Sequence, residues 1–86
     1  MKIKLHKNFL KQYQRLRKNE KKRFQERRDL FLQDEFDPIL NNHSLRGKYL
    51  GCRSINVTGD LRIIYRKNST MEIIFVTIDS HSNLYG

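Results

Sequence analysis

The chain has 86 residues, one cysteine and a formal net charge of +9. This length suits one domain with a thin hydrophobic core, since a domain of this size buries only about 60–65% of the surface that its unfolded chain exposes. The lone Cys52 excludes an intramolecular disulfide, and no cluster of cysteines and histidines indicates a metal site. No apolar run is long enough for a signal peptide or a membrane span. We therefore expect a cytoplasmic protein that needs no metal or cofactor and does not bind a membrane.

The positive charge is concentrated in the first third of the chain. Residues 1–28 hold twelve lysines and arginines against two acidic residues, a net +10, whereas residues 29–86 carry a net −1. Such a block attracts phosphate backbones through counterion release, although a solvated helix face is the common alternative. The asymmetry favours an RNA or ribosomal partner. We expect the contacts to come from cations of the predicted helices: Lys11, Arg15, Lys18, Lys22 and Arg23.

The N-terminal half predicts a strand followed by a helical hairpin. Polar and apolar residues alternate over residues 2–5, which indicates an edge strand. Asn8 is the expected N-cap of a first helix, and Asn19 should separate it from a second helix over residues 20–35. The helical region should end before Pro38, because the residue that precedes a proline is disfavoured in the helical conformation.

The C-terminal half predicts an antiparallel meander. Residues 39–51 have the composition of a loop. Three runs rich in β-branched and aromatic residues follow, at 53–57, 61–66 and 72–79, with a tight-turn sequence at 58–60. The whole pattern is a single α+β domain over residues 1–86, with the order β-α-α-β-β-β. The helices should cover one face of the sheet, and we expect function on the other face.

Several side chains of the C-terminal half have the chemistry needed to cut RNA. His81 lies just beyond the last predicted strand, His43 in the loop, Asp60 in the turn, and Arg62 projects from a strand. Cleavage requires a base for the 2′-OH, a cation for the phosphorane, an acid for the leaving 5′-oxygen and a held substrate. Histidine, arginine, aspartate and tyrosine can supply these without a metal, whereas an isolated histidine at a strand end is commonly idle.

Three segments resemble one known toxin family. Residues 43–53 (HSLRGKYLGCR) resemble the His-x-Leu-x-Gly…Gly-x-Arg segment of the YafQ branch of the RelE/ParE toxin superfamily. Residues 59–65 (GDLRIIY) are similar to its Asp-containing strand, and residues 80–85 (SHSNLY) resemble its closing Thr/Ser-His-x-x-Leu-Phe/Tyr. The resemblance covers residues 43–86 closely and the rest of the chain loosely.

The resemblance implies a microbial-RNase-like fold and the toxin of a type II toxin–antitoxin pair. Such a toxin is a ribosome-dependent mRNA endoribonuclease that works through metal-independent attack of the 2′-OH on the phosphodiester. His81 falls on the family's catalytic histidine, His43 and Asp60 fall on positions implicated in activity, and Tyr85 falls on the terminal aromatic. Arg62 matches the catalytic arginine of RelE-type and YoeB-type relatives.

The chain departs from the YafQ pattern at three positions. Asn56 stands where a second catalytic histidine is expected, Leu61 replaces an aromatic residue, and Thr77 replaces an arginine. Our hypothesis is that Arg62 takes over the phosphate-stabilising role of the missing arginine. Two alternatives therefore stay open: a ParE-like gyrase inhibitor, and a catalytically inactive member of the fold that binds RNA or the ribosome.

Further residues are predicted to contact RNA. Arg46 and Lys48 flank a loop glycine and could bind the backbone, and Asn56 could contact the message. Arg53 is equally well explained as a phosphate contact or as a brace of the loop.

The resemblance also implies a cognate antitoxin. We expect it to be acidic and to form a hetero-oligomeric complex with the toxin, whereas charge repulsion should keep the free toxin monomeric.

Overall fold

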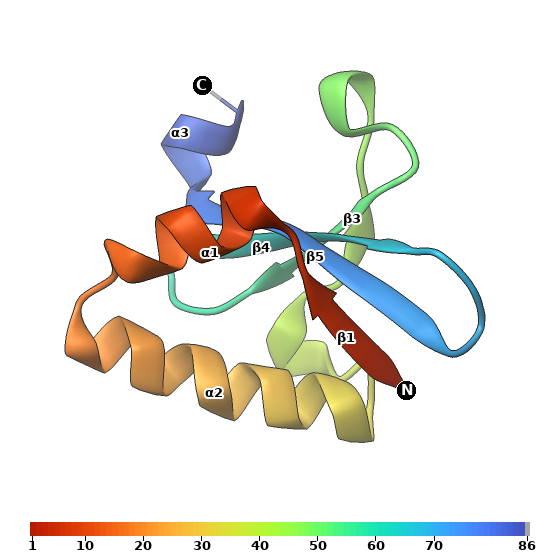
Figure 1. The fold of residues 1–86 in the computed structure, drawn as a ribbon, viewed down its shortest axis with the longest axis horizontal. Helices are drawn as coiled ribbons and strands as arrows, with labels where there is room; N and C mark the ends of the chain where they lie inside the picture. Colours follow the sequence, from red (N-terminus) through yellow and green to blue (C-terminus); the bar gives the residue numbers. More distant parts are fainter. Residues whose placement is uncertain (86) are drawn as a thin grey trace.

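A five-stranded mixed sheet organises the protein in a computed structural model that describes residues 1–85 (Figure 1). Its strands are β1 (Lys2–Leu5), β2 (His43–Ser44), β3 (Arg53–Asn56), β4 (Leu61–Lys67) and β5 (Glu72–Ser80), in the spatial order β1-β5-β4-β3-β2. β1 runs parallel to β5, and all other neighbours are antiparallel. The α+β class and the antiparallel meander, β3-β4-β5, are confirmed.

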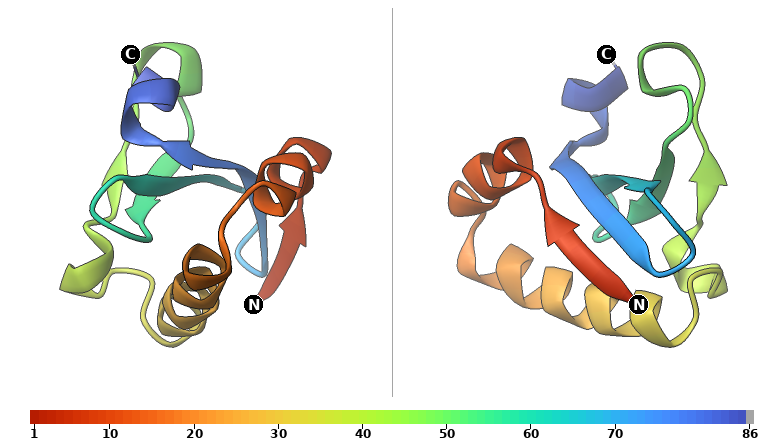
Figure 2. Two further views of the ribbon diagram at one scale, coloured as in Figure 1. Left: turned by 90° about the vertical axis from the view of Figure 1, so that its left-hand side faces the viewer. Right: turned by 45° about the vertical axis from the view of Figure 1, so that its right-hand side comes forward.

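The helical elements lie on both sides of the sheet. They are α1 (Lys7–Gln14), α2 (Lys18–Gln33), the short 3₁₀ turns η1 (Pro38–Leu40) and η2 (Gly47–Tyr49), and α3 (His81–Tyr85). α2 runs beneath the sheet and α1 flanks its β1–β5 side, while α3 and the loop with η2 rise from the opposite side (Figure 2). Within residues 1–85, no helix is long and apolar enough to cross a membrane.

The first helix begins two residues earlier than a cap at Asn8 would allow. His6 is the N-cap, and its Nδ1 accepts a hydrogen bond from the Asn8 backbone N–H at 3.0 Å. The prediction of Asn8 as the cap was wrong because an imidazole nitrogen supplies the acceptor that serine, threonine, aspartate or asparagine normally provides.

The second helix also begins before its predicted start. Arg17 is the N-cap, and its backbone N–H donates to Glu20 Oε1 at 2.8 Å. A glutamate at this third helical position satisfies the cap amide, as in one half of a capping box. Asn19 therefore lies inside α2 and does not cap it.

Aromatic side chains join the two long helices to the sheet. Phe31 of α2 is fully buried, and its ring centroid lies 5.0 Å from Tyr65 and 5.7 Å from Phe75. Phe9 of α1 contacts Phe24 at 5.5 Å and Phe75 at 5.7 Å. Each such pair contributes about 0.5–1.5 kcal/mol beyond the burial of its surface. A short chain has few side chains to place in its core, and a few large aromatic rings fill it here.

One extra residue interrupts the pairing of β4 with β5. Ile64 pairs with Thr77 and Tyr65 pairs with Phe75, so Val76 is left over as a β-bulge. A bulge inserts one residue into one strand and shifts the alternation of side chains beyond it. Ile73 and Phe75 before the bulge and Ile78 after it all belong to the core.

The segment predicted as a loop is more structured than expected. Residues 39–51 contain most of η1, the edge strand β2 and η2. His43 consequently lies in β2, opposite Ser54 of β3, and its predicted loop position was wrong. Two paired residues give too little alternation to be detected in a sequence.

Shortening Phe31 should weaken the core without removing it. We expect Phe31→Leu to lower the free energy of unfolding by about 1–2 kcal/mol, because two aromatic contacts and part of the buried surface are lost. Urea denaturation followed by circular dichroism measures this change. Leu32→Ala on the same helix, where the side chain is 43% exposed, should cost less than half as much. Equal losses in the two variants would contradict the proposed core.

Candidate functional site

The sheet face opposite α2 carries a row of polar side chains. Asn56, Arg62 and Asp79 lie opposite one another on β3, β4 and β5. Directly opposed residues share a face and successive residues alternate, so the row points away from the buried Ile63 and Ile78. The structure therefore brings the predicted Asn56 and Arg62 together and adds Asp79, which sequence reasoning missed.

Arg62 holds the turn between β3 and β4. Its Nη1 donates to the carbonyl oxygens of Thr58 and Gly59, both at 2.9 Å. Among residues 1–85, its Nη2 has no hydrogen-bond partner. The side chain can thus brace the turn with one nitrogen and offer the other to an anion.

Asp60 connects that turn to His81. Its carbonyl oxygen accepts the His81 backbone N–H at 2.8 Å, and its Oδ1 lies 3.3 Å from the same nitrogen. The His81 ring lies 4.8 Å from the Tyr85 ring, one helical turn along α3. Four of the five predicted catalytic residues are therefore connected: Asp60, Arg62, His81 and Tyr85.

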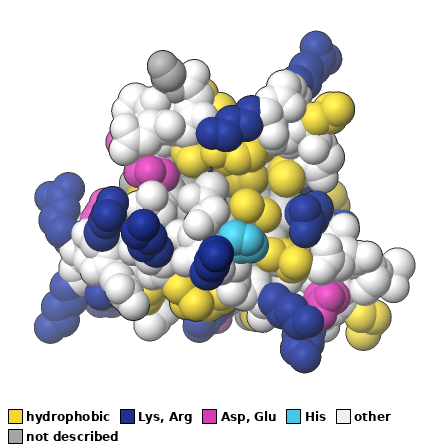
Figure 3. Space-filling view, turned by 45° about the horizontal axis from the view of Figure 1, so that its top comes forward, with side chains coloured by type: hydrophobic (Ala, Val, Ile, Leu, Met, Phe, Trp, Pro, Cys, Tyr) yellow, Lys and Arg dark blue, Asp and Glu magenta, His cyan; other side chains and the backbone are white. Residues whose placement is uncertain are grey.

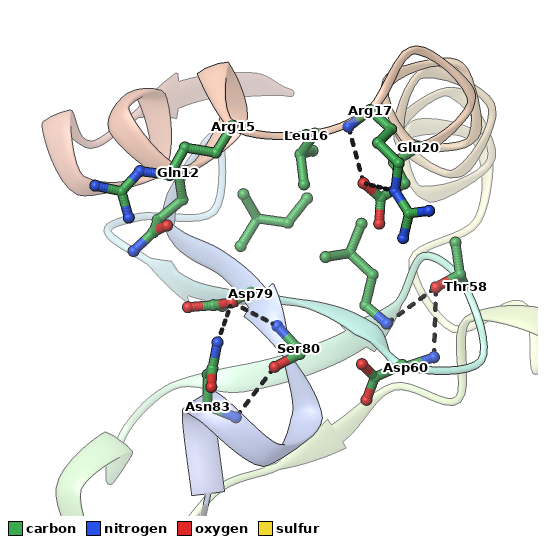
Figure 4. A pocket seen from close by; sticks show the side chains of 12 residues that line it. Gln12, Arg15, Leu16, Arg17, Glu20, Thr58, Asp60, Asp79, Ser80 and Asn83 are labelled. Atoms are coloured by element: carbon green, nitrogen blue, oxygen red, sulfur yellow. Dashed lines mark hydrogen bonds and ion pairs between the residues drawn. The ribbon is translucent and has the colours of Figure 1, made fainter.

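The helix that carries His81 was not predicted, nor were the residues that hold it. Ser80 Oγ accepts the Asn83 backbone N–H at 3.1 Å, which caps α3. Asp79 Oδ1 accepts both the Ser80 backbone N–H, at 2.8 Å, and the Asn83 side-chain amide, at 3.0 Å. Figure 4 shows these three residues together, facing Asp60 across a cavity. A serine just before the segment was the one sequence signal for a helix start here.

His43 lies apart from His81. Its Nδ1 is 2.9 Å from the carbonyl oxygen of Asn41, whose backbone is left-handed with φ 47°. A proton on Nδ1 satisfies that carbonyl and leaves Nε2 as the free nitrogen. β2 and β5 are three strand spacings apart, about 14 Å. The structure does not bring His43 into contact with the residues around His81.

Cations converge on one groove beside this site. A cavity of about 330 Å³, here called the basic groove, lies between α1 and the η2 loop, and its floor is Val76 and Thr77. Its walls include Lys11, Arg15 and Lys48. Figure 3 shows lysine and arginine side chains around an apolar hollow on this face. A second cavity, of about 500 Å³, shares Arg15 and is also lined by Asp60, Asp79 and Asn83.

The remaining predicted cations lie elsewhere. Lys18 and Lys22 lie side by side on α2 with Lys21, and Arg23 pairs with Glu26 at 3.5 Å. Arg46 lines a different cavity, formed by the outer side of the η2 loop with Arg53 and Lys67. The residues grouped as RNA-binding thus form more than one surface.

Arg53 braces the loop and lies on the helix-covered face. It lies opposite the buried Tyr65 in the register of β3 and β4, and its Nε donates to Asn42 Oδ1 at 2.7 Å. The Asn42 amide donates to the Tyr65 hydroxyl at 2.6 Å, and that hydroxyl donates to Glu35 Oε2 at 2.7 Å. Of the two predicted roles of Arg53, the geometry supports the brace of the loop. The contact is made with the side-chain amide oxygen of Asn42. Burial, with help from the hydrogen bond to Glu35, raises the pKa of the Tyr65 hydroxyl far above its usual value of 10.0.

Comparison with known protein families identifies one family for the whole chain. The family model described as "Bacterial toxin of type II toxin-antitoxin system, YafQ" matches residues 1–86. The chain therefore belongs to the YafQ family of bacterial type II toxins. No curated protein matches it significantly.

Solved structures share this fold at low sequence identity. YafQ from E. coli strain BL21(DE3) superposes with a TM-score of 0.82 at 18% identity, covering 98% of this chain and 97% of that one. YafQ in the E. coli DinJ–YafQ toxin–antitoxin complex gives 0.79 at 19%, covering 98% and 96%. The YoeB/ParE toxin from Agrobacterium tumefaciens gives 0.78 at 19%, covering 94% and 99%. These likenesses establish the fold.

The Tyr65 network should make stability fall in alkaline solution. The native pKa of Tyr65 is raised, so between the unfolded and the native pKa the unfolded chain has lost a proton that the native chain keeps. This contribution to stability is complete below about pH 10 and decreases above it, by at most about 1.4 kcal/mol per pH unit. Chemical denaturation from pH 9 to 11 should show a shallower decline for Tyr65→Phe than for the wild type.

Tyr49→Phe controls for tyrosine ionisation outside the network. It should keep the wild-type slope. Identical slopes for the wild type and Tyr65→Phe would contradict the buried, proton-retaining hydroxyl.

Proposed function

We propose that this toxin is an endoribonuclease that cuts mRNA in the ribosomal decoding site, without a metal ion. The observation that carries the proposal is the joining of His81, Tyr85, Asp60 and Arg62 through α3 and the β3–β4 turn, beside a groove lined with cations. These groups provide a proton donor, an aromatic surface, a carboxylate and a guanidinium at one end of the sheet.

Substrate binding is assigned to the two cationic surfaces. Lys11, Arg15 and Lys48 line the basic groove and would hold the phosphates of the message. Lys18 and Lys22 on α2 face another side and would contact ribosomal RNA together with Arg23. Arg46, on the outer side of the η2 loop, is assigned to the same docking role.

The reaction that these residues support is an in-line transesterification. The 2′-oxygen attacks phosphorus while its proton passes to a base, and the bond to the 5′-oxygen breaks as that oxygen receives a proton. His81 is the acid, and Asp60, whose Oδ1 holds the His81 backbone, offers Oδ2 as the base. Arg62 Nη2 stabilises the phosphorane charge, and Tyr85 stacks on a base or positions the phosphate. The products are a 2′,3′-cyclic phosphate or 3′-phosphate and a 5′-OH.

Two other residues of the open face would contact neighbouring nucleotides. His43 lies in β2, three strands from β5, and its Nδ1 is held by the Asn41 carbonyl. Asn56, opposite Arg62, provides an amide where an acid–base histidine is expected. In this scheme both side chains hold RNA.

The partner proposed for the toxin is an acidic antitoxin. Solved relatives include a DinJ–YafQ complex from E. coli and a YoeB–YefM complex from Staphylococcus aureus. With its net charge of +9, the free toxin should remain monomeric, and the neutralised complex should be hetero-oligomeric.

A second candidate, a non-cleaving RNA-binding member, is favoured by the departures on the open face. Asn56 lies there and cannot donate or accept protons as histidine does near neutral pH, and Thr77 provides no cation where an arginine is expected. Such a protein would bind RNA through both cationic surfaces and would lack only the cleavage activity.

Replacing His81 should abolish cleavage and spare ribosome binding. We expect His81→Ala to lower mRNA cleavage about 10²- to 10⁴-fold, the usual contribution of one acid–base group. Primer extension on ribosome-bound mRNA measures the cut, and the 5′ end of the downstream product, 5′-OH or 5′-phosphate, reports its chemistry. Arg62→Ala belongs in the same series because it tests the phosphate-stabilising role, and Thr70→Ala, an exposed residue of the β4–β5 turn, is the control.

Each outcome of that assay selects one function. Wild-type cleavage that leaves a 5′-OH and that His81→Ala loses supports the endonuclease. Ribosome binding without cleavage by the wild type supports the inactive member, and intact mRNA with DNA damage supports a gyrase inhibitor. A Mg²⁺-dependent 5′-phosphate product would contradict the proposed chemistry, and wild-type cleavage by Arg62→Ala would remove Arg62 from it.

The two cationic surfaces should separate in binding experiments. One variant combines Lys11→Gln with Arg15→Gln, and the other combines Lys18→Gln with Lys22→Gln. Because each variant removes two phosphate contacts, the slope of log K for ribosome binding against log salt should become shallower by about 1.4–1.8 in each. Only the groove pair should also weaken binding of a short mRNA oligonucleotide without ribosomes, measured by fluorescence anisotropy. Equal effects of the two pairs on the oligonucleotide would contradict separate surfaces.

A further inference from the structure

α3 carries the proposed acid but is too short to be stable by itself. It has five residues, His81–Tyr85, whereas isolated helices shorter than about 12–15 residues are marginal in water. Four of its residues are exposed and Leu84 is half-buried, so α3 buries little surface that could hold it. The position of the His81 ring therefore depends on the polar contacts that tie α3 to the end of β5.

Asn83 ties α3 to the end of β5 through both its backbone and its side chain. Its backbone N–H donates to Ser80 Oγ at 3.1 Å, and its side-chain amide donates to Asp79 Oδ1 at 3.0 Å. The same oxygen of Asp79 accepts the Ser80 N–H at 2.8 Å. One carboxylate oxygen thus fixes both the start of α3 and its third residue.

Asp79 also lies directly opposite the proposed phosphate-binding cation. It pairs with Arg62 across β4 and β5, so both side chains occupy the open face. Nevertheless, no ion pair joins them among residues 1–85. Arg62 is bound to the carbonyl groups of Thr58 and Gly59, and Asp79 is bound to Ser80 and Asn83. If Asn83 released Asp79, the carboxylate would be free to neutralise Arg62.

We propose that Asp79 and Asn83 form a clamp that positions His81 and keeps the carboxylate away from Arg62. Both are positioning residues, since neither needs to touch the reacting atoms. Their effect on cleavage rests on the proposed function, whereas their effect on the order of α3 does not. The clamp works through a hydrogen-bond acceptor at Oδ1, so the negative charge of Asp79 is not required.

Substitutions separate the acceptor from the charge. Asn83→Ala and Asp79→Ala should each lower kcat about 10- to 100-fold with little change in KM, the usual cost of misplacing a catalytic group by about 1 Å. Asp79→Asn keeps an oxygen at this position and should restore most of the activity. The double variant Asp79→Ala/Asn83→Ala should be no worse than Asp79→Ala alone, because the side-chain contact of Asn83 is already lost in that variant. Asn19→Ala, an exposed asparagine on α2, is the matched control.

Hydrogen exchange tests the clamp independently of catalysis. By NMR, the amides of His81 and Asn83 should exchange faster in Asn83→Ala and Asp79→Ala and at the wild-type rate in Asp79→Asn. Unchanged exchange and unchanged cleavage in Asn83→Ala would overturn the clamp. Asp79→Asn as impaired as Asp79→Ala would also overturn it, since the charge would then be what matters. If the wild type cuts no RNA, the proposed function fails and the exchange rates still decide the clamp.

Discussion

The hydrogen bond between the His81 backbone N–H and the Asp60 carbonyl, 2.8 Å long, joins two segments 21 residues apart in the chain. It fastens the end of β5 to the turn before β4, and Arg62 braces that turn from the sheet. Because this connection is made by backbone atoms, the catalytic side chains need not hold one another. The ring of His81 and the Oδ2 of Asp60 therefore remain available for substrate.

Charge and chemistry occupy different parts of the molecule. The net +10 of residues 1–28 lies on the helices, whereas residues 29–86, with a net −1, supply the proposed catalytic groups. Arg15 is the link, because it lines both the basic groove and the cavity beside Asp60. Phosphate attraction can thus act over long range from α1 and α2, on surfaces largely separate from the groups that would cut.

Periodic elements and family motifs were predictable, and short or tertiary features were not. Alternation revealed the three long strands, and the motifs marked His81, Asp60 and Arg62 as site residues. β2 and α3 hold two and five residues, too few for a period, and α1 begins at an unusual histidine cap. The role of Arg53 stayed open because only the strand register places it beside Tyr65. The contact of Asp79 with Asn83 depends on a helix that no pattern indicated.

The bulge at Val76 determines which side chains of β5 face the core and which face the proposed active site. Without the bulge, uninterrupted alternation from Ile73 and Phe75 through Val76 would turn Asp79 into the core and Ile78 toward the groove. Deleting Val76 would restore regular pairing and leave the faces of the last four residues of β5 unchanged, whereas inserting one further residue between the bulge and Ile78 would exchange them. Insertions in this strand are therefore constrained by the polarity of its faces as well as by its length.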